Sequence, residues 1–293
     1  FSDSSAIPTL YVSQLTRQHV TVSLTGDGGD ELFAGYPRYR AVQLGQWIDR
    51  LPGFVRSMLG AKLWQRMPAS PRQKSFRRQL KRFLEAIVQS PLERYLQWIA
   101  IFNEQRRALL YAPDFAASLE GYSSLEFLQQ AKKRSASRDP VSCIALTDLV
   151  TYLPCDLMTK VDIASMAHAL ECRQPFLDYR VVELAAKIPI KYKLRGGRSK
   201  RILVDTFRRF LPPEVQSRGK MGFGVPIDHW FRGPLADFTR EVLTDRRTVE
   251  RGFFNPSAVK QILDDHQARR FDHAYRIWSL LFFELWQRRW IDE

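Results

Sequence analysis

Helix-start signals recur along most of this chain, whereas one early segment has the pattern of a β-strand. A capping residue followed by proline or by a polar first turn marks the beginning of a helix. Residues 19–24 (HVTVSL), rich in β-branched side chains and followed closely by glycine, predict a short buried strand. The capping residues that precede periodic apolar segments are Ser90, Asn103, Asp139, Asp178 and Asn255.

This distribution limits the fold. A complete α/β domain alternates strands and helices throughout, and the chain does not. We therefore expect an α/β parent domain of which residues 1–293 form mostly the α-helical C-terminal part, with one or two parallel strands remaining and most of the sheet before residue 1. We treat residues 1–293 as a single partial domain. The last apolar segment, residues 274–291, predicts a core helix, and residues 66–74 and 134–140 predict exposed connections.

Composition narrows the class of protein only in part. Hydrophobic residues make up 45% of the 293 residues, enough for a real core. No run approaches the roughly 20 apolar residues of a membrane span, and the first residues, FSDSSAIP, have neither a signal peptide nor an initiator methionine. We expect no membrane association and a chain that continues upstream. The net charge of +14 permits nucleic acid, phosphorylated small molecules or an acidic partner, and selects none of them.

The cysteines give a further expectation about location. Cys143, Cys155 and Cys172 are widely spaced, and none of them belongs to a CxxC pair. This spacing is typical neither of a disulfide framework nor of a zinc site. We therefore expect the protein to be located in a reducing cytoplasm.

An acidic, glycine-rich turn follows the predicted strand, in TVSLTGDGGDELFAGY. Asp27, Asp30 and Glu31 would repel one another unless a cation or a helix N-terminus compensates their charge. A glycine loop between a strand and a helix commonly holds phosphate groups, and aspartates beside it suggest Mg²⁺ bridging pyrophosphate oxygens. The sequence is neither the dinucleotide fingerprint nor a Walker loop. The alternative is a tight turn with helix-capping acids and no ligand.

Four motifs, in order over roughly 210 residues, make the sequence recognisable. TGDGGDELFAGYPRY resembles the SGDGGDELFGGYxRY segment of glutamine-hydrolysing asparagine synthetases. The other three are YLPCDLMTKVDIASMAHALECRQPFLDYRVVELA, GRSKRILVDTFRRFLPPEV and RGKMGFGVPIDHWFRGPL. The resemblance implies an ATP-pyrophosphatase-type domain, similar to adenine-nucleotide α-hydrolases. Such a domain activates a carboxylate as its acyl-adenylate, releases pyrophosphate, and amidates the carboxylate with ammonia from glutamine.

Two parts of that family are missing from this sequence: the N-terminal glutaminase domain and the SGGxDS loop that grips pyrophosphate. The resemblance therefore covers the C-terminal part of the synthetase domain. It implies ATP and Mg²⁺ as cofactors. The reactants would be glutamine-derived ammonia and a small carboxylate, for which aspartate is the first candidate. We expect residues 1–293 alone to be inactive. The oligomeric state, a homodimer included, is left open.

The resemblance also implies roles for individual residues. Asp27 would serve the acyl-adenylate step, Asp30 would hold magnesium and pyrophosphate, and Lys200 would stabilise the reacting acyl–phosphate centre. Glu31 suits a helix N-terminus better than a metal. The residues expected to contact ATP are Thr25, Gly26, Gly28 and Gly29.

A second group would line or brace the site: Lys160, Asp162, Glu171, Arg173 and Lys220. Glu171 and Arg173 share a face if the segment is extended, and either a buried ion pair or direct substrate contact fits them. Asp156 and Lys160, four residues apart, could instead form a surface pair.

Departures from the family pattern leave other substrates and other functions open. Ala34 and Cys155 differ from the usual residues, as do Cys172 and Gln174 on either side of Arg173, and these last two put aspartate itself in doubt as the acceptor. The alternative from another class is a basic helical nucleic-acid-binding domain, supported by residues 72–82 and 132–134. Because aromatic residues are scarce in those clusters, we expect no nucleic-acid partner. A non-catalytic fragment is the remaining alternative.

Overall fold

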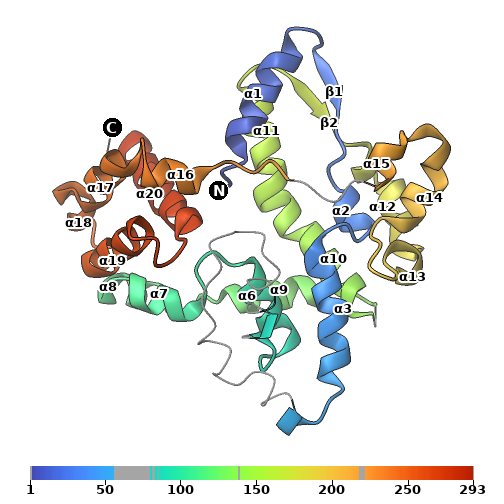
Figure 1. The fold of residues 1–293 in the computed structure, drawn as a ribbon, viewed down its shortest axis with the longest axis horizontal. Coiled ribbons are helices and arrows are strands. Elements are labelled where there is room, and N and C mark those ends of the chain that lie inside the picture. The colour runs from blue at the N-terminus through green and yellow to red at the C-terminus, as the bar shows by residue number, and fades with distance from the viewer. Residues whose placement is uncertain are drawn as a thin grey trace.

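The computed structural model describes residues 2–55, 80, 83–84, 86–137, 139–217 and 222–292. Most of these residues are helical (Figure 1). The first half contains α1 (Ala6–Arg17), β1 (Val22–Leu24), α2 (Gly29–Leu32), α3 (Pro37–Asp49), α6 (Pro91–Ile99), α7 (Glu104–Leu110), α8 (Pro113–Ser118), α9 (Ser124–Lys133), α10 (Pro140–Val150), η2 (Leu153–Met158) and α11 (Thr159–Met166).

The second half begins with a strand and continues as helices. It contains β2 (Glu171–Arg173), η3 (Pro175–Leu177), α12 (Tyr179–Lys187), α13 (Ile190–Lys193), α14 (Arg201–Phe207), η4 (Arg208–Phe210), α15 (Pro213–Ser217), α16 (Ile227–Arg232), α17 (Ala236–Thr244), α18 (Arg246–Glu250), α19 (Pro256–Gln267) and α20 (Ala274–Trp290).

The described residues contain one small sheet. Its strands β1 and β2 pair in parallel, with Val22 opposite Glu171 and Leu24 opposite Arg173. The expectation of one or two parallel strands is confirmed. The predicted strand was too long, because the backbone N–H groups of His19 and Val20 bond to the carbonyl of Thr16 and continue the end of α1.

The prediction that this strand is buried was wrong. Val22 is 36% exposed and Leu24 is 73% exposed. Alternation along a strand tells which side chains share a face. It does not tell whether another layer covers that face, and in the described residues none covers Leu24.

The predicted helix starts are confirmed by side-chain caps. Each capping side chain accepts a hydrogen bond from a backbone N–H in the first turn, which satisfies a group that the helix itself leaves unpaired. At α6 the cap is reciprocal, because Glu93 also accepts from the backbone N–H of Ser90. The capped helices are α6 at Ser90, α7 at Asn103, α10 at Asp139, α12 at Asp178 and α19 at Asn255.

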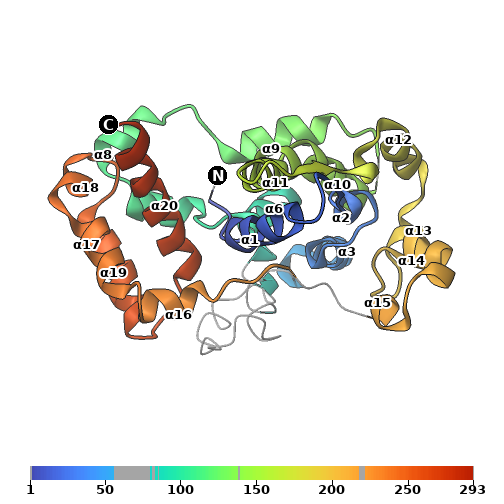
Figure 2. The ribbon, with the colours of Figure 1, turned by 90° about the horizontal axis from the view of Figure 1, so that it is seen from above.

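Three apolar clusters hold the helices together. One joins α3, α6, α9 and α10 around Tyr39, Tyr95 and Ile144. A small second cluster packs α2 against α12 through Phe33 and Ala185. The third joins α16, α17, α19 and α20. In Figures 1 and 2, α16–α20 and α12–α15 lie at opposite ends of the molecule.

The prediction that α20 is a core helix holds for one face. Ile277, Leu280 and Leu281 are buried, whereas Trp286 and Trp290 are 46% and 67% exposed. Residues 134–137 and 139 lie between α9 and α10, as expected, and Pro140 begins α10. The predicted connection at residues 66–74 lies outside the described residues.

One described run, Pro140–Met166, is long and apolar enough by length and composition to cross a membrane. It spans α10, η2 and α11. However, Asp148 and Lys160 lie within it, and both side chains are buried and bonded to other parts of the protein. Those contacts are typical of a core helix in a folded domain.

Candidate functional site at the acidic glycine turn

The acidic turn leads from β1 into the short helix α2. The backbone N–H of Thr25 donates to the carbonyl of Arg173 at 2.8 Å, which continues the pairing of β1 with β2. The Thr25 hydroxyl then donates to Asp27 Oδ2 at 2.8 Å. Gly28 adopts φ +84°, a left-handed conformation natural to glycine, and a Cβ there would overlap the Leu177 side chain. Glycine is therefore required where the chain enters α2.

Asp30 and Lys200 meet at this turn. Asp30 Oδ1 lies 3.0 Å from Lys200 Nζ, and the side chains are 12% and 31% exposed. The backbone also joins the two segments, because the Lys200 N–H donates to the carbonyl of Phe33 at 3.0 Å. A Cβ on Gly35 would overlap both Asp30 Oδ1 and Lys200 Cε. The absence of a side chain at Gly35 thus permits the ion pair.

The turn has an open part and a buried part. The residues from Gly28 to Gly35 are buried, whereas Thr25 and Asp27 are partly exposed and Gly26 is exposed. Apart from Gly26 itself and its two chain neighbours, no atom of the described residues lies within 4 Å of the place where a Cβ of Gly26 would stand. The turn is therefore not sealed inside the protein, and Lys200 lies beside it.

Glu31 faces the interior. It is 2% exposed, and its Oε1 accepts a hydrogen bond from the Tyr36 hydroxyl at 2.8 Å. Its Oε2 is buried and has no hydrogen-bond partner among the residues that the structure describes. Burial raises the pKa of this carboxyl, and the Tyr36 bond offsets part of that increase.

A buried polar cluster, which the sequence reasoning missed, supports this turn from behind. Asp148 of α10 is 1% exposed and accepts from the Tyr39 hydroxyl at 2.7 Å, from the Tyr95 hydroxyl, and from Arg38 Nε at 3.0 Å. The Arg38 guanidinium also stacks 4.0 Å from the centre of the Tyr36 ring. Tyr36 in turn holds Glu31. A lone aspartate in the apolar run VSCIALTDLVTYL is the signal that could have revealed this cluster.

Glu171 and Arg173 form an ion pair of 2.7 Å on one face of β2, as their spacing predicts. The reading of a buried pair was wrong, because the side chains are 55% and 64% exposed. The two-stranded sheet leaves this face open. An exposed pair of this kind contributes little stability.

Lys160 does not form the surface pair with Asp156 that the spacing suggested. It is buried, and its Nζ lies 3.0 Å from Asp3 Oδ2 and 2.9 Å from Ser5 Oγ. The close packing of α1 against α11 brings these groups together. Asp162 is exposed on α11. Lys220 lies outside the described residues.

The carboxylates of the turn fit a metal only in partnership with a ligand. Among the described residues, no group of three or more His, Cys, Asp or Glu side chains is placed to hold a metal ion. Mg²⁺ in nucleotide enzymes commonly uses one or two protein carboxylates together with phosphate oxygens. Asp27, partly exposed beside Gly26, and Asp30, whose carboxylate meets Lys200, are the carboxylates of the turn that could fill that smaller requirement.

Comparisons with known proteins identify a family that matches nearly the whole chain. The asparagine synthase family matches residues 1–288. The chain is 32% identical over 288 residues to a Bacillus subtilis protein named asparagine synthetase [glutamine-hydrolyzing] 1, covering 97% of this chain and 43% of that protein. A putative asparagine synthetase [glutamine-hydrolyzing] from Mycobacterium tuberculosis is also 32% identical, over 99% of this chain and 43% of its own length. A Gibberella zeae protein named amidase chry2 is 22% identical over 84% of this chain and 38% of its own length.

A strand, an acidic glycine turn and a lysine held beside it are thus found in a chain that matches one family over nearly its whole length. The chain belongs to the asparagine synthase family. It spans less than half the length of the curated relatives that it matches.

Proposed function

We propose that this chain supplies the C-terminal part of an ATP-dependent amide-forming synthetase. The whole protein would activate a carboxylate as its acyl-adenylate, release pyrophosphate, and amidate the carboxylate with ammonia derived from glutamine. The observation that carries this proposal is the Asp30–Lys200 pair, in which a carboxylate from the buried part of the glycine turn meets a partly exposed lysine. A carboxylate and a partly exposed ammonium 3.0 Å apart suit a site where phosphate charge is bound and transferred.

Each residue of the turn has a proposed task. Thr25, Gly26, Gly28 and Gly29 would bind ATP, and Asp27 would act in the acyl-adenylate step. Lys200 would exchange its contact with Asp30 for a phosphate oxygen, which a compact and mobile ammonium group can do. Asp30 would hold Mg²⁺, which supplies charge neutralisation at the pyrophosphate. Both Glu31 and Asp148, which lie behind the turn, would position it.

The residues that we expected to line or brace the site lie farther from one another than the sequence suggested. Arg173 lies next to Thr25 through the backbone bond between them, so Arg173 and Glu171 are proposed to border the site. Lys160 would brace α1 against α11 through Asp3. Asp162 and Lys220 keep a proposed site-lining role.

Aspartate is the proposed acceptor, because two of the relatives are named asparagine synthetases. Cys172 and Gln174, which we expect near the bound acceptor carboxylate, differ from the usual residues of the family. The Cys172 thiol lies 3.3 Å from Ser23 Oγ across the sheet, and Gln174 Nε2 donates to the Cys172 carbonyl at 3.1 Å. Related carboxylates therefore belong in any substrate test. The proposed partners are a glutaminase part and ATP, and the proposed location is the cytoplasm.

The nucleic-acid alternative has little support in the described residues. Most of the cluster at residues 72–82 lies outside them. Lys132 and Lys133 occupy the last turn of α9, where positive charge stabilises a helix C-terminus. This local role accounts for part of the basic charge without a nucleic-acid partner.

The proposal is tested by carboxylate-dependent exchange of labelled pyrophosphate into ATP. The whole protein that carries this chain is expected to catalyse exchange with aspartate or a related acid, and only when Mg²⁺ is present. Residues 1–293 alone are expected to give none, because the SGGxDS loop is missing. Exchange that is absent from the whole protein with every small dicarboxylate and sugar acid tried would overturn the proposed adenylation.

Replacing Lys200 with alanine in the whole protein is expected to spare ATP binding more than turnover. A charge-assisted contact made in the transition state corresponds to a loss of about 10- to 100-fold in kcat. The Kd for ATP should change by less than about threefold, since other groups of the turn also bind the nucleotide. The exposed Lys187 of α12, changed to alanine, is the matched control. A large loss of ATP affinity with an unchanged kcat would make Lys200 a binding residue only.

A further inference from the structure

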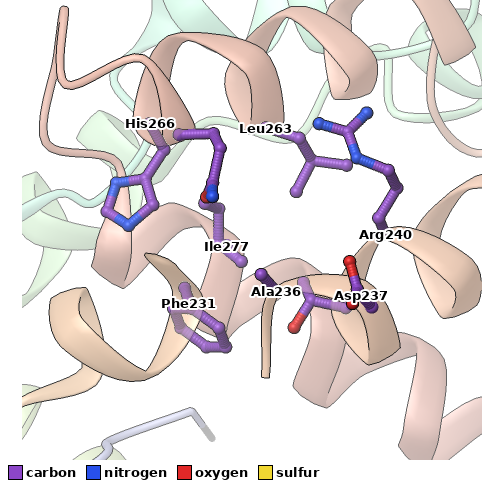
Figure 3. Close-up of a pocket in the computed structure, with 9 residues that line it drawn as sticks. Phe231, Ala236, Asp237, Arg240, Leu263, His266 and Ile277 are labelled. Carbon is purple, nitrogen blue, oxygen red and sulfur yellow. The ribbon is translucent and has the colours of Figure 1, made fainter. Parts of the chain in front are cut away.

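The last helix, α20, carries apolar side chains on two opposite faces. On one face, Ile277, Leu280 and Leu281 pack into the core that α20 shares with α16, α17 and α19. In Figure 3, Ile277 lies on that side, at a small pocket that Phe231 and Leu263 also line. A helix that is apolar around its whole circumference is normally buried on all sides. We therefore expect the opposite face of α20 to be covered as well.

That opposite face carries an aromatic stripe, which consists of Tyr275, Phe282, Trp286 and Trp290. These side chains recur every seven or four residues and therefore lie along one side of the helix. Their exposed fractions are 46%, 36%, 46% and 67%, in that order. The Phe282 ring stacks on Trp278 at 5.7 Å, which holds the middle of the stripe in place. The two tryptophans carry the largest part of the exposed aromatic surface.

The size of the stripe indicates an interaction site and favours one kind of occupant. An aromatic side chain has roughly 150–250 Å² to bury, so four that are exposed to this degree leave roughly 300–500 Å² of apolar surface in solvent. Patches of this size commonly mark interaction sites, where aromatic residues are enriched. A stable dimer buries more, roughly 800 Å² on each partner. A segment of the same polypeptide needs less area, because its covalent tether removes most of the entropic cost of association.

The first described residue of the chain lies against this stripe. Ser2 Oγ is 3.2 Å from Ser279 Oγ, and Ser279 lies on α20 between Tyr275 and Phe282. In Figures 1 and 2 the N-terminus accordingly lies beside α20. Trp286 is two helical turns beyond Ser279, a rise of about 10 Å, which about three or four extended residues span. Residues that precede position 1 are thus within reach of the tryptophans.

We propose that the aromatic stripe of α20 is the docking surface for the polypeptide that directly precedes residue 1 in the whole protein. An apolar segment of that polypeptide, held close by the Ser2–Ser279 contact, covers Trp286 and Trp290 and ties α20 to the part of the protein outside this chain. The relatives contain such additional polypeptide, because the asparagine synthetases that match this chain have more than half of their length outside the match. The interface does not depend on the proposed catalytic function.

Photo-crosslinking in the whole protein tests which segment lies on the stripe. A benzophenone amino acid in place of Trp286 is expected to form cross-links within the same molecule, to peptides from about the 20 residues before residue 1, because a few extended residues and a helix of ordinary length cover that distance. The same probe in place of Phe127, a 52% exposed side chain of α9, is the control and should form none with those peptides. A mixture of isotopically light and heavy protein identifies cross-links between copies.

Hydroxyl-radical footprinting of the same protein measures whether the stripe is covered. Relative to the urea-unfolded protein, oxidation of Trp286 and Trp290 is expected to fall about tenfold, since the core of an interface leaves aromatic rings almost no exposed area. Trp286→Glu should abolish most of the protection of Trp290, because a segment that covers the position would bury an unpaired carboxylate. The matched control, Trp47→Glu, changes a 64% exposed tryptophan of α3 and should leave the protection of Trp290 unaltered.

The proposal is overturned by any of three results. The first is the absence of cross-links from position 286 to the peptides directly before residue 1. The second is cross-links that form mainly between light and heavy copies, which would assign the stripe to a second copy of the protein. The third is oxidation of Trp286 and Trp290 at rates near those of the unfolded protein, which would leave the stripe exposed.

Discussion

Asp30→Asn in the whole protein is expected to lower magnesium-dependent adenylate formation by about 10²- to 10³-fold. Asparagine keeps the size of the side chain but removes the negative charge that lies 3.0 Å from Lys200. In the proposed site this charge both holds Mg²⁺ and orients the lysine. The loss therefore affects the chemical step, and it is measured as the initial rate of labelled pyrophosphate exchange across a range of Mg²⁺ concentrations.

The control for this variant is Asp205→Asn. Asp205 lies on α14 close after Lys200 in sequence, and its half-exposed carboxylate pairs with Arg198 and Arg201. It loses the same charge near the site without touching the turn, so its exchange rate should remain within about twofold of the parent, as for most surface changes. A rate for Asp30→Asn that equals that of Asp205→Asn at every Mg²⁺ concentration would rule out the metal role.

Asp148→Asn is expected to reduce the free energy of unfolding by about 3–5 kcal/mol, the usual loss when one partner of a buried ion pair is removed. The substitution leaves Arg38 in a largely buried position without its counter-ion. It also weakens the acceptor shared by the Tyr39 and Tyr95 hydroxyls. Equilibrium urea denaturation of the full chain, followed by tryptophan fluorescence, measures the change.

Asp264→Asn gives the comparison for this stability effect. Asp264 pairs with Arg240 at 2.7 Å, but both side chains are about two-fifths exposed, at 42% and 41%. Solvent screens such a pair, so its loss should change the free energy of unfolding by less than about 1 kcal/mol. If Asp148→Asn is no more destabilising than Asp264→Asn, the polar cluster does not brace the turn.

Much of the local structure could be predicted from the sequence. Ser90, Asn103, Asp139, Asp178 and Asn255 cap helices as expected, because capping depends on residues within a single turn. Pro37 begins α3 for the same local reason, because its missing N–H is not needed in the first turn of a helix. The turn itself was also identified, since its glycines and acids are adjacent in the chain.

Burial and partner choice could not be predicted in this way. The sequence suggested Asp156 as the partner of Lys160 because they are four residues apart, but Lys160 bonds to Asp3, 157 residues away. Likewise, the alternation in β2 placed Glu171 and Arg173 on one face, although the lack of a covering layer made that face exposed.

The sequence by itself determined where helices begin and where the turn needs glycine, because those properties depend on short-range sterics and hydrogen bonds. Its four motifs also determined which family the chain resembles. The tertiary structure decided which charges neutralise one another. Asp148 is buried against side chains 109 and 110 residues away, and Asp30 meets Lys200 only after α14 folds back on α2. The interaction between two charges depends on their separation in space, and only the packing of the chain sets that separation.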